Sequence, residues 1–539
     1  MSKIKNLFSI LCPLVIVIVM GYFLSPFDYA KTNALRYEYQ ANKYGAFLAA
    51  QHALYINDFE KAVEFSAALQ DKDIPIVGNT VILSGFLSGN VLENPGSFKE
   101  ETGTASQLIH DAYLLRKDDW KSVYAKHKKD DSLIMAPLRI WSGVALGKSD
   151  ESLKFISKLK TNDSWKSFVR GQIYAETNKP ELAAKQFGKV SVDFINVNDY
   201  LYMIAFYKHN KMFDAAEKLK KEFTERPGGM YMLNVKISPD WSDYGGYRNA
   251  LAFGLVQNVS HTQIMMYSDL SILMLRLAEI SQKTEENNAV NYYIGQYFFN
   301  NGGDYEKYFN SIDPKSPFYS FALTRLAEKT DEIDKLEIAV QANPLFVPAV
   351  AKLVAKYVQK GDKNKALRVV DLALKNDNLT DQGKAFFLKS RANIYFMFDD
   401  MESAQSDIRD AADILPVDAN ILAMQSKIWS AQKRELETAY KYAIALVRKN
   451  PTDVEFWNVL GMAVRAKEGA ASALELIERV GQVSESCSAL FEQLGDLYLE
   501  LGNTKLAKDA YLRAIDLSDD GLAIVPKLEK KLSKIIKDK

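Results

Sequence analysis

The sequence is poor in several features on which other classes of protein depend. Its 539 residues contain only two cysteines, Cys12 and Cys487, so no disulfide framework and no cysteine metal site can be built from them. Lysine and arginine together number 68, as do aspartate and glutamate, and the formal net charge is zero. This balance lacks the basic surplus that binding to nucleic acid requires. We therefore expect a fold held by packing alone and no nucleic acid partner.

The motifs of common catalytic and metal sites are also missing. None of the five histidines is paired with another at helical i, i+4 spacing, and none stands in H-E-x-x-H. No P-loop, G-x-G-x-x-G or G-x-S-x-G pattern occurs. The sequence therefore predicts no metal, no cofactor and no catalysis.

Long apolar runs are absent except for one near the N-terminus. Leu7–Leu24 has 18 residues, or about 27 Å as a helix, which is just enough to cross the bilayer core. Lys3 and Lys5 precede it and predict a cytoplasmic N-terminus with the rest of the chain outside. The residues after the run contain no clear A-x-A cleavage site, so we expect an uncleaved anchor in 1–29. A cleaved export signal is the alternative.

What the sequence does contain is an internal repeat. Two stretches near the C-terminus match at a fixed offset of 34 residues, a period typical of helical repeat arrays. The first includes Trp457, Leu460, Gly461 and Ala473, and the second includes Phe491, Leu494, Gly495, Tyr498, Ala507, Tyr511 and Ala514. Glycine and alanine at these positions let two helices of a hairpin approach closely, and stacking of successive hairpins completes the core.

The same register continues towards the N-terminus in weaker form. Gly171 and Ala183 keep the relative spacing, and Asn57-Asp58-Phe59 reads as a turn between two helices. A break follows Glu225, where about thirty residues lack a helical period. We expect five segments: the anchor (1–29), degenerate hairpins (30–226), an irregular segment followed by a helical connector (227–312), the repeat array (313–521) and a C-terminal capping helix (522–539). A basic helix on a membrane surface is the alternative for the last segment.

The pattern aromatic-x2-Leu-Gly-x2-Tyr, followed by the alanine of the second helix, resembles the tetratricopeptide repeat. This resemblance implies an all-α fold, a right-handed superhelical solenoid of antiparallel helix pairs, which binds a protein or peptide in its concave groove. The chain also resembles bacterial cell-envelope tetratricopeptide proteins, in the first hairpin at 45–53 and the step at 316–319. That resemblance implies a single-pass protein of the bacterial inner membrane with its array in the periplasm, or a periplasmic protein if the signal is cleaved.

In such a solenoid, fixed positions of the first helix of each hairpin line the groove. The residues predicted for the partner groove are Phe386, Lys389, Asn393, Phe396, Met397, Ile421, Met424, Ile428, Asn458, Met462 and Arg465, with Glu492 and Asp496 at the same positions of the last repeat. Lys389 and Asn393 stand where some family members hold a peptide carboxylate, but Gln425, Glu455 and Val459 depart from that clamp. The apolar members favour a hydrophobic peptide groove, and packing between repeats is the alternative.

Three functional hypotheses follow. The first is a scaffold, anchored or exported, that binds a protein or peptide. The second is an enzyme with a site in 226–310, for which Asp240, Asp243 and His261 are candidates without a motif. The third is a purely structural spacer of the envelope.

Overall fold

Helical hairpins account for the regular structure of the chain. The computed structural model describes residues 43–69, 75–89, 104–226, 228–235, 241, 244–261, 269–282, 288–483, 487–518 and 525–537. Within these ranges the regular elements are helices and no β-strand occurs, which confirms the predicted all-α class. No helix in this part of the chain is long and apolar enough to cross a membrane, and the predicted anchor lies outside it.

The chain divides into two compact units. The first comprises the chain up to residue 148, residues 251–283 and residues 293–305. Its helices are α3 (Lys43–Tyr55), α4 (Phe59–Ala67), α5 (Pro75–Leu87), α6 (Thr104–Arg116), α7 (Trp120–His127), α8 (Ala136–Ala145), α15 (Asp269–Ser281), and parts of α14 (Tyr247–His261) and α16 (Asn288–Asn301). Arg276 of α15 is buried in this unit and donates through Nε to the carbonyl of Leu87, at 2.7 Å. The charged side chain thereby satisfies a carbonyl at the end of α5.

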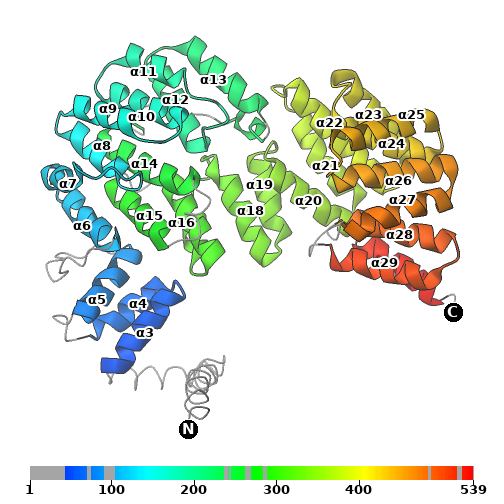
Figure 1. The fold of residues 1–539 in the computed structure, drawn as a ribbon, viewed down its shortest axis with the longest axis horizontal. Coiled ribbons are helices and arrows are strands. Elements are labelled where there is room, and N and C mark those ends of the chain that lie inside the picture. Colours follow the sequence, from blue (N-terminus) through cyan, green and yellow to red (C-terminus); the bar gives the residue numbers. More distant parts are fainter. Residues whose placement is uncertain are drawn as a thin grey trace, which may run out of the picture. The chain divides into compact units, whose positions relative to one another are not determined.

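The second unit begins with the helices α9 to α13 and continues as the array of paired helices from α18 to α29. Its first elements are α9 (Ser149–Lys158), α10 (Asp163–Glu176), α11 (Pro180–Phe187), α12 (Val197–His209), α13 (Phe213–Glu225) and the short helix η1 (Met230–Met232). After α17 (Tyr305–Asn310) come the paired helices of the array. The pairs are α18 (Phe318–Thr330) with α19 (Ile333–Ala342), α20 (Val347–Gln359) with α21 (Lys363–Leu374), α22 (Asp381–Met397) with α23 (Met401–Ile414), α24 (Ala419–Gln432) with α25 (Leu436–Lys449), α26 (Val454–Glu468) with α27 (Ala470–Val483), and α28 (Ser488–Glu500) with α29 (Thr504–Asp516). Figure 1 shows these pairs following one another in chain order.

Most turns inside the hairpins share one backbone conformation, from which the turns before α25 and α27 depart. The residue two positions before the second helix has positive φ, as at Asn57, Asn178, Gly361 and Gly502. The next amide then donates to the carbonyl five residues earlier, from Asn503 to Tyr498, for example, at 2.8 Å. This is the Schellman arrangement that ends a helix at a left-handed residue. Asparagine, aspartate and glycine favour such positions, and the turn predicted at residues 57–59 has this form.

The predicted close approach of the paired helices is present. A Cβ added at Gly495 would lie 2.5 Å from Cδ1 of Tyr511, and one at Gly461 would lie 2.6 Å from Cγ1 of Ile477. The alanines of the second helices, Ala473 and Ala507, are fully buried. A glycine on the first helix of the hairpin therefore makes room for a large side chain that lies sixteen residues later on the second helix. The same pairing occurs between Gly171 and Phe187 in the N-terminal part of the second unit.

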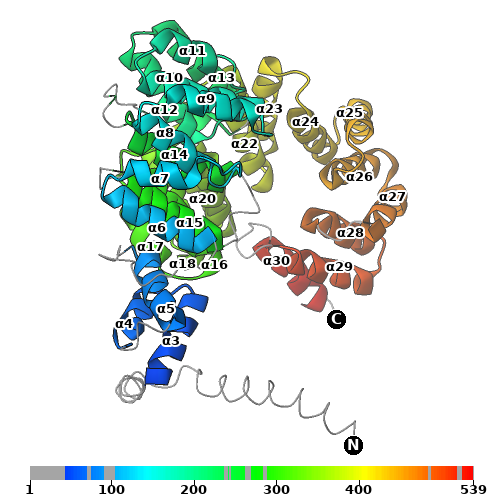
Figure 2. The same ribbon diagram turned by 60° about the vertical axis from the view of Figure 1, so that its left-hand side comes forward.

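The helix α30 (Val525–Lys537) covers the end of the array, as Figure 2 shows. Leu528, Leu532 and Ile535 are buried against Tyr511 and neighbouring alanines of α29. Lys531 also forms ion pairs with Glu492, at 2.7 Å, and Asp496, at 2.6 Å, both on α28. The apolar face of α30 is therefore occupied by the last repeat.

The irregular segment after α13 contributes to the core of the second unit. Tyr231 of η1 is buried edge-on between the rings of Phe321 and Phe346, with centroids 5.2 and 5.7 Å away. The amide of Asn343 donates to the Tyr231 carbonyl at 2.8 Å. These contacts join an element before the array to the array's first helices. The five segment boundaries given by the sequence stay predictions.

Candidate partner groove

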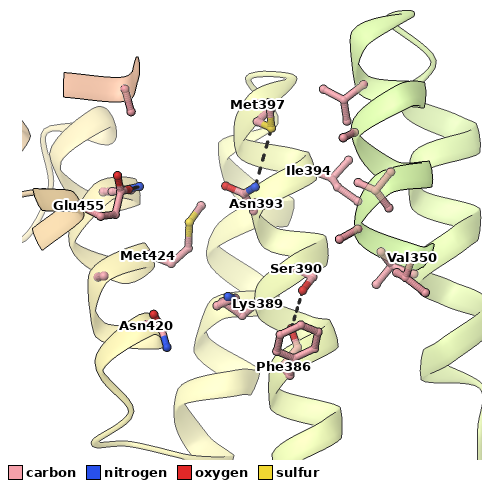
Figure 3. Close-up of a pocket in the computed structure, with 18 of the residues that line it drawn as sticks. Val350, Phe386, Lys389, Ser390, Asn393, Ile394, Met397, Asn420, Met424 and Glu455 are labelled. Atoms are coloured by element: carbon pink, nitrogen blue, oxygen red, sulfur yellow. Dashed lines mark hydrogen bonds and ion pairs between the residues drawn. The ribbon is translucent and has the colours of Figure 1, made fainter. Parts of the chain in front are cut away.

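A cavity of about 570 Å³ opens along the first helices of successive hairpins in the second unit. Its walls come from α20, α22 and α24, with the first turns of α26 and α28 at one end (Figure 3). The α20 wall is apolar and consists of valines and alanines. Helical spacing explains the α22 wall, because Lys389, Asn393 and Met397 are four residues apart and therefore share one face.

Five of the predicted groove residues line this cavity. They are Phe386, Lys389, Asn393, Met397 and Met424. Met397 leaves 40% of its surface exposed, so a bound segment could contact it. Phe396 does not line the cavity and instead packs against the core cluster between α22 and α24.

The assignments on α24 are wrong for two residues. Ile421 and Ile428 are buried in that core cluster and do not face the groove; Asn420, Ala423 and Lys427 do. The reason is an extra residue in the turn before α25, where Lys433 and Glu435 both have positive φ. This extra residue shifts the repeat positions of α24 by one residue relative to Ala439 of α25. Ser426 therefore takes the place of the hairpin glycine, fully buried and donating to the Ala439 carbonyl at 2.9 Å.

The predicted residues on α26 lie apart from the cavity. Asn458 is buried, and its Oδ1 has no hydrogen-bond partner within the described residues. Arg465 pairs with Glu500, and its Nε lies 2.8 Å from a carboxylate oxygen. Met462 does not line the cavity either. Glu455 does line the cavity, although the sequence indicated it only as a departure from a carboxylate clamp.

The groove carries three charged side chains with different surroundings. Lys427 forms an ion pair with Glu455 across the α24–α26 step. The ammonium of Lys389 lies 5.3 Å from the centroid of the Phe386 ring, and no described carboxylate comes within 4.0 Å of it. Burial lowers the pKa of Lys389; Asp418 opposes this effect, and the charge of Lys427 adds to it. Among the described residues, Lys389 is therefore a groove cation without a paired carboxylate.

No metal site accompanies the groove. In the part of the chain that the structure describes, no group of three histidine, cysteine, aspartate or glutamate side chains is placed to hold a metal ion. Of the residues considered for an enzyme site, Asp240 and Asp243 lie outside that part, and His261 ends α14.

Comparison with known proteins adds a family to this geometry. Residues 489–520, which include nearly all of α28 and all of α29, match a family model of the tetratricopeptide repeat. The hairpin of α28 and α29 therefore matches the tetratricopeptide repeat. The buried alanine of this repeat recurs in every hairpin of the array and its left-handed turn in most of them, which confirms the predicted tetratricopeptide-like solenoid. No curated protein matches the sequence.

Several solved tetratricopeptide structures are similar at low identity. A tetratricopeptide repeat protein from Parabacteroides merdae ATCC 43184 is 12% identical, with 54% of this chain and 100% of that chain covered and a TM-score of 0.35. YrrB, a tetratricopeptide protein with an unusual peptide-binding site, is 19% identical over 36% of this chain and 99% of its own, with a TM-score of 0.23. Yeast Tom70 is 11% identical over 92% of this chain and 96% of its own, with a TM-score of 0.27.

Proposed function

We propose that the protein is a non-catalytic scaffold whose tetratricopeptide array binds an apolar segment of a partner protein or peptide. The observation that carries this proposal is the groove itself, in which apolar walls surround the half-buried Lys389. Concave, mostly apolar sites of about this volume with few polar groups are typical of ligand-binding pockets. An apolar segment would cover side chains such as Met397 and Phe386 and remove them from water.

The same proposal includes a location in the cell envelope. The apolar run 7–24 and the lysines before it support a single-pass anchor in the bacterial inner membrane, with the array in the periplasm. If the run is instead a cleaved signal, the array is periplasmic without an anchor. Protease treatment of spheroplasts tests the orientation, since a periplasmic array is digested and a cytoplasmic one is protected.

The binding function is tested by photo-crosslinking from the groove. A photoreactive phenylalanine analogue replaces Met397, and a control protein carries it at Ile338, an exposed position on α19 away from the cavity. We expect a defined crosslinked partner only from position 397, and loss of that product when Phe386→Asp places a charge at the partly exposed wall of the groove. Equal crosslinking from both positions, or none from either, contradicts the proposal and favours a structural spacer.

A further inference from the structure

The two lysines of the groove differ in what neutralises them. Lys427 on α24 is paired with Glu455 on α26, whereas no carboxylate in the described part of the chain lies within 4.0 Å of the Lys389 ammonium on α22. Both lysines line the same cavity, and the charge of Lys427 contributes to the lowered pKa of Lys389. Figure 3 shows Lys389 on the side of α22 that faces α24. Lys427 and Lys389 are therefore neighbouring cations. Glu455 forms an ion pair with Lys427, and no described carboxylate forms one with Lys389.

Glu455 forms the ion pair with Lys427 that a carboxylate of a ligand would otherwise form. Its side chain lines the cavity and is 42% exposed, so it stands at the surface that a bound segment would contact. A carboxylate of the partner near Lys427 would have to displace Glu455 or approach its negative charge. Like-charge juxtaposition of this kind is a common source of specificity.

At Lys389 a partner carboxylate would be attracted and not repelled. Half-burial weakens the hydration of the ammonium, and Asp418 opposes this effect without forming an ion pair with it, so a partner carboxylate would gain a charge-assisted hydrogen bond there. The amide of Asn393, one helical turn along α22, makes a weak contact with the Met397 sulfur at 3.8 Å and no other hydrogen bond within the described residues. That amide is available to hold the second oxygen of the same carboxylate.

We propose that Glu455 is a specificity-determining residue which, together with Lys389, limits the groove to apolar segments that carry a single carboxylate. This inference rests on the proposed function and names the chemistry of the partner. Lys389 selects for one negative charge, and Glu455 selects against a second.

The test uses the full-length protein and synthetic peptides. The probes are terminally blocked, fluorescently labelled nonapeptides of leucine, alanine and phenylalanine that contain no glutamate, one glutamate, or two glutamates at varied separation. Affinities are measured by fluorescence anisotropy. We expect one glutamate to tighten binding about tenfold or more over none, in line with a hydrogen bond to a charged group, and the second to add nothing. Lys389→Met should abolish the advantage of the first glutamate, whereas Lys384→Met, on an exposed part of α22 outside the cavity, should not.

Glu455→Gln tests the second half of the inference. Releasing Lys427 should let the peptide with two glutamates bind about tenfold tighter than the peptide with one. The gain should disappear in Lys427→Met/Glu455→Gln, and Glu468→Gln on the exposed end of α26 should leave the ranking of peptides unchanged. Thermal melting checks that each variant is folded, and Glu455→Asn replaces Glu455→Gln if the latter is not.

The outcomes separate this inference from the function on which it rests. If no peptide binds the wild-type protein, the proposed function fails and the inference fails with it. If the peptides bind without regard to charge, the function stands and the inference is overturned. If a single glutamate is preferred but Glu455→Gln does not change the ranking, Glu455 has no role in selection.

Discussion

At the scale of the residue, small side chains decide how closely the helices of a hairpin pack. The sequence pattern identified Gly461, Gly495 and their buried alanine partners correctly because the steric demand is local and repeats at a fixed spacing. Glu176 shows what such a pattern misses. Its carboxylate accepts hydrogen bonds from the Gly246 amide at 2.7 Å and from the Tyr202 hydroxyl at 3.2 Å. The contact with Gly246 spans 70 residues and leaves no trace in local spacing.

The first residue-scale prediction concerns Gly495→Ala. The added methyl group would overlap the Tyr511 ring, and overpacking of this kind costs about 1–3 kcal/mol, which exceeds the gain in helix propensity of about 1 kcal/mol. We expect faster hydrogen exchange in α28 and α29. Gly188→Ala is the control, because its Cβ would meet nothing closer than a carbonyl at 3.4 Å. Equal exchange in the two variants would contradict the steric role of Gly495.

The second concerns pH and Glu176. Burial raises the pKa of Glu176 above its ordinary value of 4.5, although the Gly246 and Tyr202 hydrogen bonds oppose this. The folded protein therefore binds this proton more tightly than the unfolded chain does. The resulting stabilisation is complete below about pH 4.5 and is lost as the pH rises through the folded-state pKa.

Glu176→Gln keeps an acceptor for the Gly246 amide and removes the titration. We expect the free energy of unfolding of the wild type, relative to this variant, to fall as the pH increases from 4 to 7. Urea denaturation followed by circular dichroism at each pH measures this difference, and comparison at equal pH cancels the other titrating groups. A difference that does not change with pH would show that the carboxyl is not desolvated.

At the scale of the element, the turn sets the register of the helix before it. Ala439 follows Ala404 by 35 residues, one more than the 34-residue period, but this spacing does not show on which side of α24 the extra residue lies. The structure places it in the turn at 433–435, where two residues with positive φ accommodate it. Hydrophobic spacing could not reveal this, because α24 carries apolar residues on both candidate faces. Of the groove residues predicted on α22, Phe386, Lys389, Asn393 and Met397 line the cavity and Phe396 does not, whereas on α24 only Met424 does.

Charged contacts between elements form a further level of organisation. Arg391 of α22 binds Asp407 of α23 through two nitrogens, each at 2.7 Å, and Asp371 of α21, also at 2.7 Å. Asp407 is buried, so removing the arginine leaves a carboxylate without a counter-charge. We expect Arg391→Met to destabilise the α21–α23 region by about 3 kcal/mol, the lower end for one partner of a buried pair.

Hydrogen exchange of α21 to α23 measures this loss. The double variant Arg391→Met/Asp407→Leu should recover part of it, because an apolar pair of similar volume leaves no buried charge behind. Exposed Arg409→Met on α23 serves as the control. If the double variant is less stable than Arg391→Met alone, the buried charge of Asp407 is not the cause of the loss.

At the scale of the whole chain, the repeat period revealed the array but not what joins its parts. The 34-residue offset was plain in the last two repeats, where glycine, alanine and aromatic positions all agree. Nearer the N-terminus, Phe187 and the left-handed turns occupy the positions expected for a hairpin, although most residues there differ from the pattern of the last two repeats. The insertion of Tyr231 between Phe321 and Phe346 was not predictable, because these rings lie 90 and 115 residues further along the chain without any shared period.

In a solenoid, each repeat is stabilised mainly by its neighbours, so the last repeat depends on whatever covers its outer face. Here that element is α30, which buries Leu528, Leu532 and Ile535 against α29 and pairs Lys531 with the acidic residues of α28. Deleting residues 525–539 should expose Tyr511 to water and leave Glu492 and Asp496 without Lys531. We expect hydrogen exchange to rise strongly in α28 and α29.

The effect should weaken with distance along the array, because only nearest neighbours are coupled, and should be absent from α18 to α21. Leu528→Asp should reproduce the deletion, since it buries a charge at the same contact, whereas Lys530→Ala, on the exposed face of α30, should not. Uniform loss of protection throughout the array would show that the second unit unfolds as one cooperative block. In that case stability would not be passed from repeat to repeat, and α30 would support the partner groove as directly as it supports α29.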